Sequence, residues 1–220
     1  MVSEKTILLT LFAIIIGCGH SIRKAKTPTA TVPTTRQIKT CVLNDLISPA
    51  PEELINSEFK AVSDEYNSKV GISFEGTKII PFNYDIEADA IDIAFYLDLV
   101  CPKESELRFI FSNRATVSSG LSGYYIPNNE VKQYAGRSHD YFGFLVLYEA
   151  EDRAKITDEG GNRAVHTTLL HEIGHLFKLD HLTDKNSFMY SPSCYSQGEW
   201  TKEVINTINR EKHRRWYPRL

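Results

Sequence analysis

Cysteine is scarce in this 220-residue sequence, and long apolar runs are missing. Four Cys are too few for a disulfide framework. No apolar stretch reaches the roughly 20 residues that a membrane-spanning helix needs, which excludes a multi-span membrane protein. A surplus of basic residues is also absent, because 25 Lys and Arg stand against 28 Asp and Glu, a formal net charge of -3. This balance argues against a nucleic-acid-binding protein.

The composition that is present is typical of a folded protein. Hydrophobic residues make up 42% of the chain and aromatic residues 11%, which is too much apolar side chain for a disordered protein. A domain at 41–220 is long enough to bury roughly 70% of the surface that its unfolded chain exposes, so it needs no cross-links to fold. We therefore expect one folded domain at 41–220, preceded by a segment of a different kind.

The first 17 residues have the form of an export signal. Lys5 is the only cation before an apolar run at 7–16, and this run is too short for a membrane span. The run ends in Ile-Ile-Gly before Cys18, which resembles the lipobox of bacterial lipoproteins. The resemblance implies cleavage after residue 17, acylation of Cys18, and attachment of the exported chain to the outer membrane or the cell surface. Plain secretion after cleavage and an uncleaved short anchor are the alternatives.

Residues 18–40 have the composition of a tether between the lipidated cysteine and the domain. After the cysteine, the segment is rich in Thr, contains Pro28 and Pro33, and has no Asp or Glu. Such a segment buries too little apolar surface to fold by itself. We therefore predict a signal peptide at 1–17 and a tether at 18–40.

Three cysteines remain beyond the lipidation site, namely Cys41, Cys101 and Cys194. An exported location permits one disulfide, with one thiol left over. We favour Cys41–Cys101, because it would tie the start of the domain to the end of a predicted strand. The sequence by itself leaves the pairing open.

The middle of the chain alternates helix-like and strand-like segments, which indicates an α/β (α+β) fold. Apolar residues at near-helical spacing predict a helix at 49–66, with Ser48 as its cap. A later helix is predicted from Ser196, where Ser and Glu have the spacing of a capping box. Runs rich in β-branched and aromatic residues predict strands at 70–74, 91–100, 107–111 and 141–148, and an edge strand within 121–130.

Residues of the kind that bind metal ions follow these elements. His171, Glu172 and His175 form an H-E-x-x-H pentad, and residues four apart share one face of a helix. Both imidazoles can therefore reach one metal ion, while Glu172 points toward the ion's open position without ligating it. Neutral imidazoles suit Zn²⁺, which in catalytic sites has three protein ligands and a position left for water.

A third imidazole, that of His181, follows the pentad by six residues. It reaches the same ion only if the helix ends soon after residue 177 and the chain turns back. A turn of this kind favours a left-handed backbone, for which glycine is the usual residue. Lys178 stands in that place, at a cost of roughly 1 kcal/mol that a metal bond could offset.

The segment 171–181 resembles the metzincin zinc motif H-E-x-x-H-x-x-G-x-x-H, with Lys178 in the glycine place. Met189, eight residues after the third histidine and followed by Tyr, is similar to the Met-turn of the matrixin branch. The resemblance implies a metzincin-like catalytic domain at 41–220, with a mixed twisted sheet, a long active-site helix, a Met-turn and a C-terminal helix. It also implies that Glu172 is the catalytic residue and that Met189 forms an apolar floor beneath the zinc ligands.

The predicted function is that of a zinc-dependent endopeptidase, which hydrolyses peptide bonds with metal-activated water. We expect a monomer that binds a protein or peptide substrate along an edge strand within 121–135. We expect it to meet the membrane through its lipid anchor and to have no nucleic-acid partner. A non-catalytic surface lipoprotein that binds zinc or a partner protein is the alternative.

Four further features have weaker claims on function. The acidic, Gly-containing stretch at 157–162 is either a plain turn or a structural Ca²⁺ site. His166 lies off the ligand face of its helix, and we interpret it as a residue of the surface or of the helix start. His139 and Tyr190 are interpreted as a loop residue and a packing residue, respectively.

Overall fold

The computed structural model describes residues 36–76, 78–86, 90–114, 123–126, 144–147, 150–155, 157, 161, 164–191 and 198–213. They form an α/β fold around one mixed sheet, as the sequence predicts. The strands are β1 (Arg36–Asp45), β2 (Ile72–Gly76), β3 (Ile80–Phe82), β4 (Leu107–Phe111), β5 (Gly123–Ile126) and β6 (Phe144–Leu147). The helices are α1 (Glu52–Val70), α2 (Ala90–Val100), α4 (Ala150–Ala154), α5 (Ala164–Leu176) and α6 (Lys202–Glu211). Within these residues, none of the helices has the length and apolar character of a membrane span.

The strands follow the order β2-β1-β4-β6-β5, and β3 pairs with the far end of β1. All pairs are parallel except that of β5, which lies antiparallel to β6 at the edge of the sheet. Parallel neighbours need a crossover connection, which α1 supplies between β1 and β2. The strands predicted at 70–74, 107–111 and 141–148 are present as β2, β4 and β6, and the predicted edge strand as β5.

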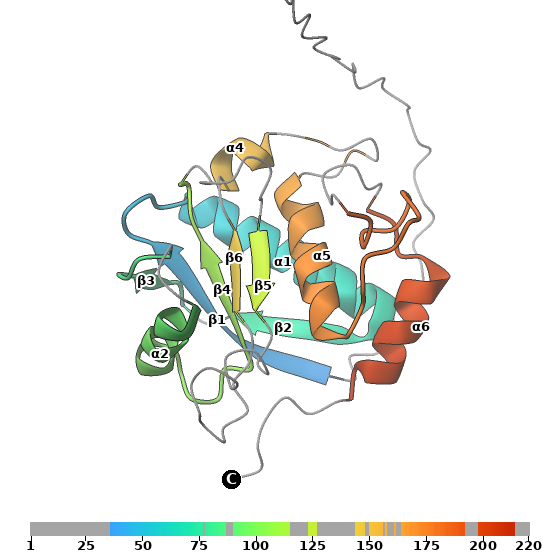
Figure 1. Cartoon of the computed structure of the whole chain (residues 1–220), viewed down its shortest axis with the longest axis horizontal. Coiled ribbons are helices and arrows are strands. Elements are labelled where there is room, and N and C mark those ends of the chain that lie inside the picture. The colour runs from blue at the N-terminus through green and yellow to red at the C-terminus, as the bar shows by residue number, and fades with distance from the viewer. Residues whose placement is uncertain are drawn as a thin grey trace, which may run out of the picture.

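Apolar side chains cover both faces of the sheet, because successive residues of a strand point to opposite sides. Phe109 and Phe111 of β4 belong to the larger core, which residues of α1, α5 and α6 complete. Ile110 between them belongs to the smaller core, which residues of α2 complete. In Figure 1, α5 and α1 accordingly lie together, while α2 lies apart from them. The helix that carries the H-E-x-x-H pentad therefore rests on the larger core.

The helix predicted at 49–66 is confirmed as α1, although its ends differ. Ile55, Val62 and Tyr66 are buried at a spacing of seven and four residues, which is the period of one helix face. The predicted cap at Ser48 is wrong, because Pro51 occupies the N-cap position and no side chain caps the helix. Acidic residues of the first turn, Glu52 among them, instead favour the positive end of the helix dipole.

The strand predicted at 91–100 is wrong, because this segment is the helix α2. In a strand, Ile93, Leu97 and Leu99 would share one buried face. In the structure Ile93 and Leu97 are fully buried, whereas the side chain of Leu99 is 84% exposed. This spacing of four is helical, and the helix provides the crossover that parallel strands β3 and β4 require on either side of β1.

A disulfide joins Cys41 of β1 to Cys101, with their Cα atoms 5.8 Å apart. This is the pairing that the sequence favoured and left open. Cys101 follows a helix rather than the predicted strand, so the bond attaches α2 to the centre of the sheet. Both cysteines are buried in the smaller core.

The sheet takes in residues 36–40, which the sequence analysis placed in the tether. Arg36 begins β1, and its guanidinium forms an ion pair with Glu106 at 3.0 Å. It also donates a hydrogen bond to the backbone carbonyl of Lys212. These five residues pair in register with β2. The folded part of the chain therefore begins before residue 41, where composition placed its start.

The last helix starts later than predicted. It begins at Lys202, and Thr201 caps it by accepting a hydrogen bond from the backbone N–H of Val204 at 3.4 Å. The predicted start at Ser196 lies outside the described residues. Val204 and Ile208 form its buried face, as the sequence predicts.

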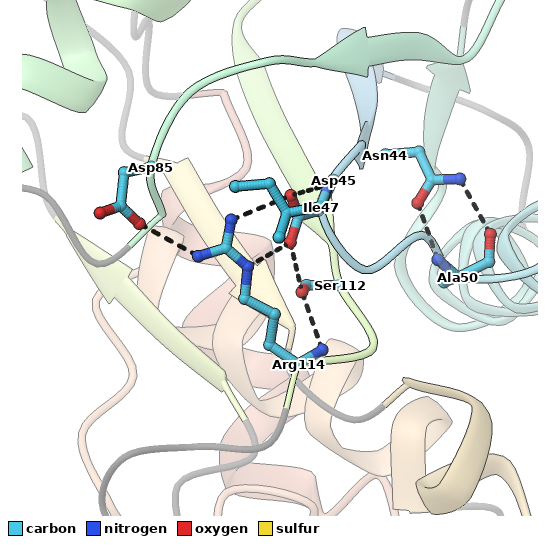
Figure 2. A network of polar contacts seen from close by, with 7 residues as sticks. All are labelled: Asn44, Asp45, Ile47, Ala50, Asp85, Ser112 and Arg114. Atoms are coloured by element: carbon cyan, nitrogen blue, oxygen red, sulfur yellow. Dashed lines mark hydrogen bonds and ion pairs between the residues drawn. The ribbon is translucent and has the colours of Figure 1, made fainter.

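A buried ion-pair network joins the carboxyl ends of β1 and β4 (Figure 2). Asp45, which is fully buried, accepts hydrogen bonds from Ser112 at 2.8 Å and from Nε of Arg114 at 2.7 Å. The same guanidinium reaches Asp85 at 3.0 Å. The network fixes the point at which the chain leaves β4 on its way to the edge strand β5.

Candidate metal centre

Three histidine rings meet at one end of α5. His171 and His175 lie one turn apart on the helix, and their ring centroids are 4.9 Å apart. The ring of His181, which follows the helix, lies 5.0 Å from that of His171 and 5.1 Å from that of His175. One nitrogen of each ring lies within 4.8 Å of the others. The structure thus brings together the three imidazoles that the motif spacing predicts.

Two backbone carbonyls orient the helical imidazoles. Nδ1 of His171 is 2.9 Å from the carbonyl oxygen of Phe188, and Nδ1 of His175 is 2.6 Å from that of Leu179. A carbonyl oxygen only accepts, so each Nδ1 carries the proton and each Nε2 keeps its lone pair for a metal ion.

Burial also keeps these imidazoles uncharged. It lowers the pKa of His171 to about 4, and it lowers the pKa of His175. Both rings are therefore in the neutral form that ligates metals at pH 7. A donor set of three imidazoles fits Zn²⁺.

The turn after α5 brings the third histidine back. The backbone N–H groups of Phe177 and Leu179 both donate to the carbonyl of Gly174, at 3.0 and 3.3 Å. Between them Lys178 has a φ of 58°, and among the described residues no other non-glycine residue has a positive φ. The predicted left-handed turn at Lys178 is confirmed, so the missing glycine does not prevent the turn.

Glu172 lies beside the first histidine on α5 and is partly buried. Burial raises the pKa of its carboxyl from 4.5 to about 7. A carboxyl group that titrates near neutral pH can both take up and release a proton, which suits a general acid–base residue.

Met189 packs directly against the ligand helix. Its side chain is fully buried, and its sulfur occupies the place that a Cβ on Gly174 would need. Gly174 lies between the two helical histidines in the sequence. The hydrogen bond from the N–H of Leu182 to the carbonyl of Met189, at 2.9 Å, ties this turn to the residue that follows His181.

Comparison with known proteins gives likenesses among solved structures. No family model matches the chain, and no curated protein matches it. Metalloproteinase-II from Bacteroides fragilis superposes with a TM-score of 0.55 at 16% identity, over 84% of this chain and 55% of that protein. Archaemetzincin from Methanopyrus kandleri superposes with a TM-score of 0.55 at 18% identity, over 83% of this chain and 99% of that one. The chain has a metallopeptidase-like fold.

The Bacteroides metalloproteinase is much longer than the part that matches, since the likeness covers about half of it. The archaemetzincin is matched over almost its whole length.

Sequence reasoning missed a second polar cluster on α5. His166 lies in the first turn of α5, as the helix-start interpretation has it, but it is not a surface residue, because only 13% of its side chain is exposed. It lies between two carboxylates of α1, those of Glu65 at 2.7 Å and Glu58 at 3.7 Å. Trp200 donates to Glu65 at 2.6 Å. The spacing of seven residues between the two glutamates places them on one face of a helix. Nothing local in the sequence, however, indicates that this face meets His166.

The ion pairs of His166 predict a loss of stability at high pH. Burial lowers the pKa of His166, but hydrogen bonds and charges from Glu58 and Glu65 outweigh it and raise the pKa from 6.5 to about 9. The folded state therefore binds this proton more tightly than the unfolded state, and the contribution is fully present below pH 6.5. It should disappear as the pH rises through about 9, at a cost on the order of 2–3 kcal/mol.

Urea unfolding of the metal-free protein at pH 6.5 and pH 9.5 measures this loss. His166→Gln is the control, because it removes the titrating group and should flatten the difference between the two pH values. An equal pH dependence in both proteins would show that His166 does not gain a proton on folding.

The contact at Gly174 predicts that Gly174→Ala destabilises the protein. The added methyl group meets the sulfur of Met189 and lies 3.1 Å from the ring of Phe188, so both buried side chains must shift. Overpacking of this kind costs about 1–3 kcal/mol. The double variant G174A/M189A tests the cause, because the methyl group then enters space that the thioether has left. Its loss in urea unfolding should be smaller than the sum of the two single losses, and additive losses would contradict the contact.

Of the remaining predicted residues, the structure describes Tyr190. Tyr190 is partly buried, and its backbone pairs with Leu182 in an isolated bridge. Cys18 and His139 lie outside the described residues, as does most of the 157–162 stretch. The lipid anchor and the Ca²⁺ site therefore stay predictions.

Proposed function

We propose that this protein is a zinc-dependent endopeptidase of the metzincin type and of its matrixin-like branch. The observation that carries the proposal is the three-imidazole cluster on a metallopeptidase-like fold, with Glu172 beside it. The two neighbours, a metalloproteinase and an archaemetzincin by name, support peptide hydrolysis as the reaction. The spacing of Met189 from the third histidine supports the matrixin-like branch.

Two roles in such a reaction fall to residues of this chain, namely metal binding and proton transfer. His171, His175 and His181 would hold the zinc ion through Nε2 of the two helical rings and a nitrogen of the third. A bound zinc ion supplies Lewis-acid polarisation and lowers the pKa of a water molecule. Glu172 takes up a proton at its carboxylate and passes it to the leaving amine. Its elevated pKa, caused by burial, suits both transfers.

The substrate class follows from the sheet. β5 is the antiparallel edge strand, and α5 packs next to it. An extended peptide can add to such an edge through main-chain hydrogen bonds, which accept many side-chain sequences. The predicted substrate-binding strand within 121–135 includes β5. We therefore propose a protein or peptide substrate that lies along β5 beside the histidine cluster.

We also propose that the enzyme is an exported, membrane-anchored monomer with an acylated Cys18. The lipobox-like sequence motivates the anchor, and a Thr-rich segment up to residue 35 would separate the lipid from β1. Mass spectrometry of the mature N-terminus tests this part by itself. An unmodified Cys18 in the mature chain would contradict the lipid anchor and favour a secreted protein.

The non-catalytic alternative drew on Lys178, because a distorted turn there could misplace His181. The ring of His181 lies 5.0 and 5.1 Å from the other two, which supports metal binding in either function. Metal analysis of the purified protein, followed by casein and peptide-library cleavage, tests the peptidase function. We expect one zinc ion per chain, cleavage that a chelator abolishes, and recovery on adding Zn²⁺. One bound zinc ion without any cleavage would favour the alternative, and cleavage insensitive to chelation would overturn the proposal.

A further inference from the structure

Glu65 of α1 connects two segments that are far apart in the sequence. Its Oε2 lies 2.7 Å from Nε2 of His166, on the helix that carries the pentad. Its Oε1 accepts a hydrogen bond at 2.6 Å from Nε1 of Trp200, in the segment between the Met189 turn and α6. One carboxylate thus holds two segments to α1, namely the helix α5 through His166 and the residues before α6 through Trp200. The N–H of Phe188 donates to the carbonyl of Glu199 at 3.1 Å, which joins Trp200's neighbour to the Met189 turn.

The contacts of Trp200 lead from this carboxylate to a metal ligand. The indole lies 4.6 Å from the ring of Tyr66 and 4.9 Å from the ring of Phe188, measured between centroids. The carbonyl of Phe188 is the group that fixes Nδ1 of His171, at 2.9 Å. Tyr66 in turn donates through its hydroxyl to the carbonyl of Leu170, the residue before His171, at 3.0 Å. Each link in this path is a direct contact.

The charges strengthen the connection at its α5 end. Two carboxylates, one of them on the fully buried Glu58, face His166 and keep it protonated at neutral pH. Hydrogen bonds between charged partners are shorter and stronger than neutral ones. Only 13% of the His166 side chain and 27% of that of Glu65 are exposed, so solvent screens the pair weakly.

We propose that Glu65 is a positioning residue of the metal site. It sets the orientation of His171 by fixing the position of α5 relative to Phe188 and Met189. This rests on the proposed function, in which the three imidazoles bind a metal ion. Glu65 would act through Trp200 and Phe188, whose carbonyl holds Nδ1 of His171. Loss of a group that hydrogen-bonds a metal ligand directly typically weakens metal binding 10- to 100-fold, and Glu65 acts further out, through Trp200 and Phe188.

The test compares Co²⁺ binding by three variants of the metal-free protein. Glu65→Ala removes both contacts and should raise the Co²⁺ dissociation constant about tenfold. Trp200→Phe keeps an aromatic ring and removes only the N–H donor, so it should raise the constant by a smaller factor. Asp98→Asn is the matched control, because it removes a similarly buried ion pair, that with Arg108 at 2.7 Å, on the opposite face of the sheet. It should lower stability without changing the dissociation constant.

A second readout needs no metal. In the metal-free wild-type protein, ¹H–¹⁵N NMR should find the proton of His171 on Nδ1, where the Phe188 carbonyl holds it. In E65A this N–H should exchange faster with solvent, and in D98N it should not. If E65A does not fold, the Co²⁺ dissociation constant and the exchange of the His171 proton are measured in W200F and E65Q instead. E65Q is the conservative variant, because it keeps an acceptor for Trp200.

The outcomes separate the two proposals. Failure of the wild-type protein to bind Co²⁺ at one ion per chain overturns the proposed function. Wild-type binding, with E65A and W200F indistinguishable from D98N in affinity and in exchange of the His171 proton, overturns the positioning role of Glu65 alone.

Discussion

Replacing Glu172 with Gln should abolish peptide hydrolysis and leave the bound zinc in place. The amide has nearly the shape of the carboxyl group but cannot accept the proton that the reaction transfers. Loss of a general acid–base residue lowers kcat/KM roughly 10²- to 10⁴-fold. The measurement is the cleavage rate of a peptide substrate alongside the zinc content of the same sample. Full activity in the variant would remove Glu172 from the mechanism.

Stability separates this chemical effect from misfolding. Burial raises the pKa of Glu172 to about 7, so the folded state disfavours its charged form. A neutral Gln avoids that penalty, and E172Q should therefore be at least as stable as the wild-type protein in urea at pH 8. Glu203→Gln is the control, because Glu203 is an exposed acid of the first turn of α6 and its loss should leave hydrolysis unchanged.

The cluster of three histidines was predictable because its information is local in the sequence. Helical periodicity alone places His171 and His175 on one face, and the backbone of α5 confirms it. The third ligand required a left-handed turn, and Lys178 adopts it at a φ of 58°. Its ammonium group lies 3.8 Å from Glu211 but is mostly exposed, so the ion pair offsets little of the strain. Packing of the buried residues on either side, Phe177 and Leu179, holds the turn instead.

The errors in the fold arose where two local patterns fit the same residues. The apolar residues at 91–100 fit both a strand period and a helix period. The segment forms a helix because it connects the parallel strands β3 and β4, which need a crossover. Residues 36–40 have a tether-like composition, yet pairing with β2 makes them a strand. In both cases tertiary pairing overrode local preference.

The contacts of Glu65 show what a single sequence does not contain. The carboxylate meets His166 and Trp200, which are 101 and 135 residues away in the chain. No local period relates these positions, so only the packing of α1 against α5 and the Met189 turn segment brings them together. The candidate metal-binding residues were thus visible in the sequence, whereas the groups that orient them depend on the folded structure.

Replacing His181 with Ala should weaken metal binding strongly while sparing the fold. His181 is exposed and lies outside the helix, so its side chain contributes little burial to the metal-free protein. Structural zinc in zinc-finger peptides binds with about 10–16 kcal/mol over four ligands, so losing one ligand should weaken binding on the order of 10²- to 10³-fold. The measurement is competition for Zn²⁺ with a chelator of known affinity, together with urea unfolding of the metal-free protein.

Two further histidines serve as controls for this result. His213→Ala alters an exposed histidine after α6 and should leave zinc affinity at the wild-type value. His171→Ala removes a buried ligand that also hydrogen-bonds the carbonyl of Phe188, so it should lower both zinc affinity and the free energy of unfolding. Wild-type zinc affinity in H181A would mean that the ion is held by the two helical imidazoles without the third. The left-handed turn at Lys178 would then have no role in ligation.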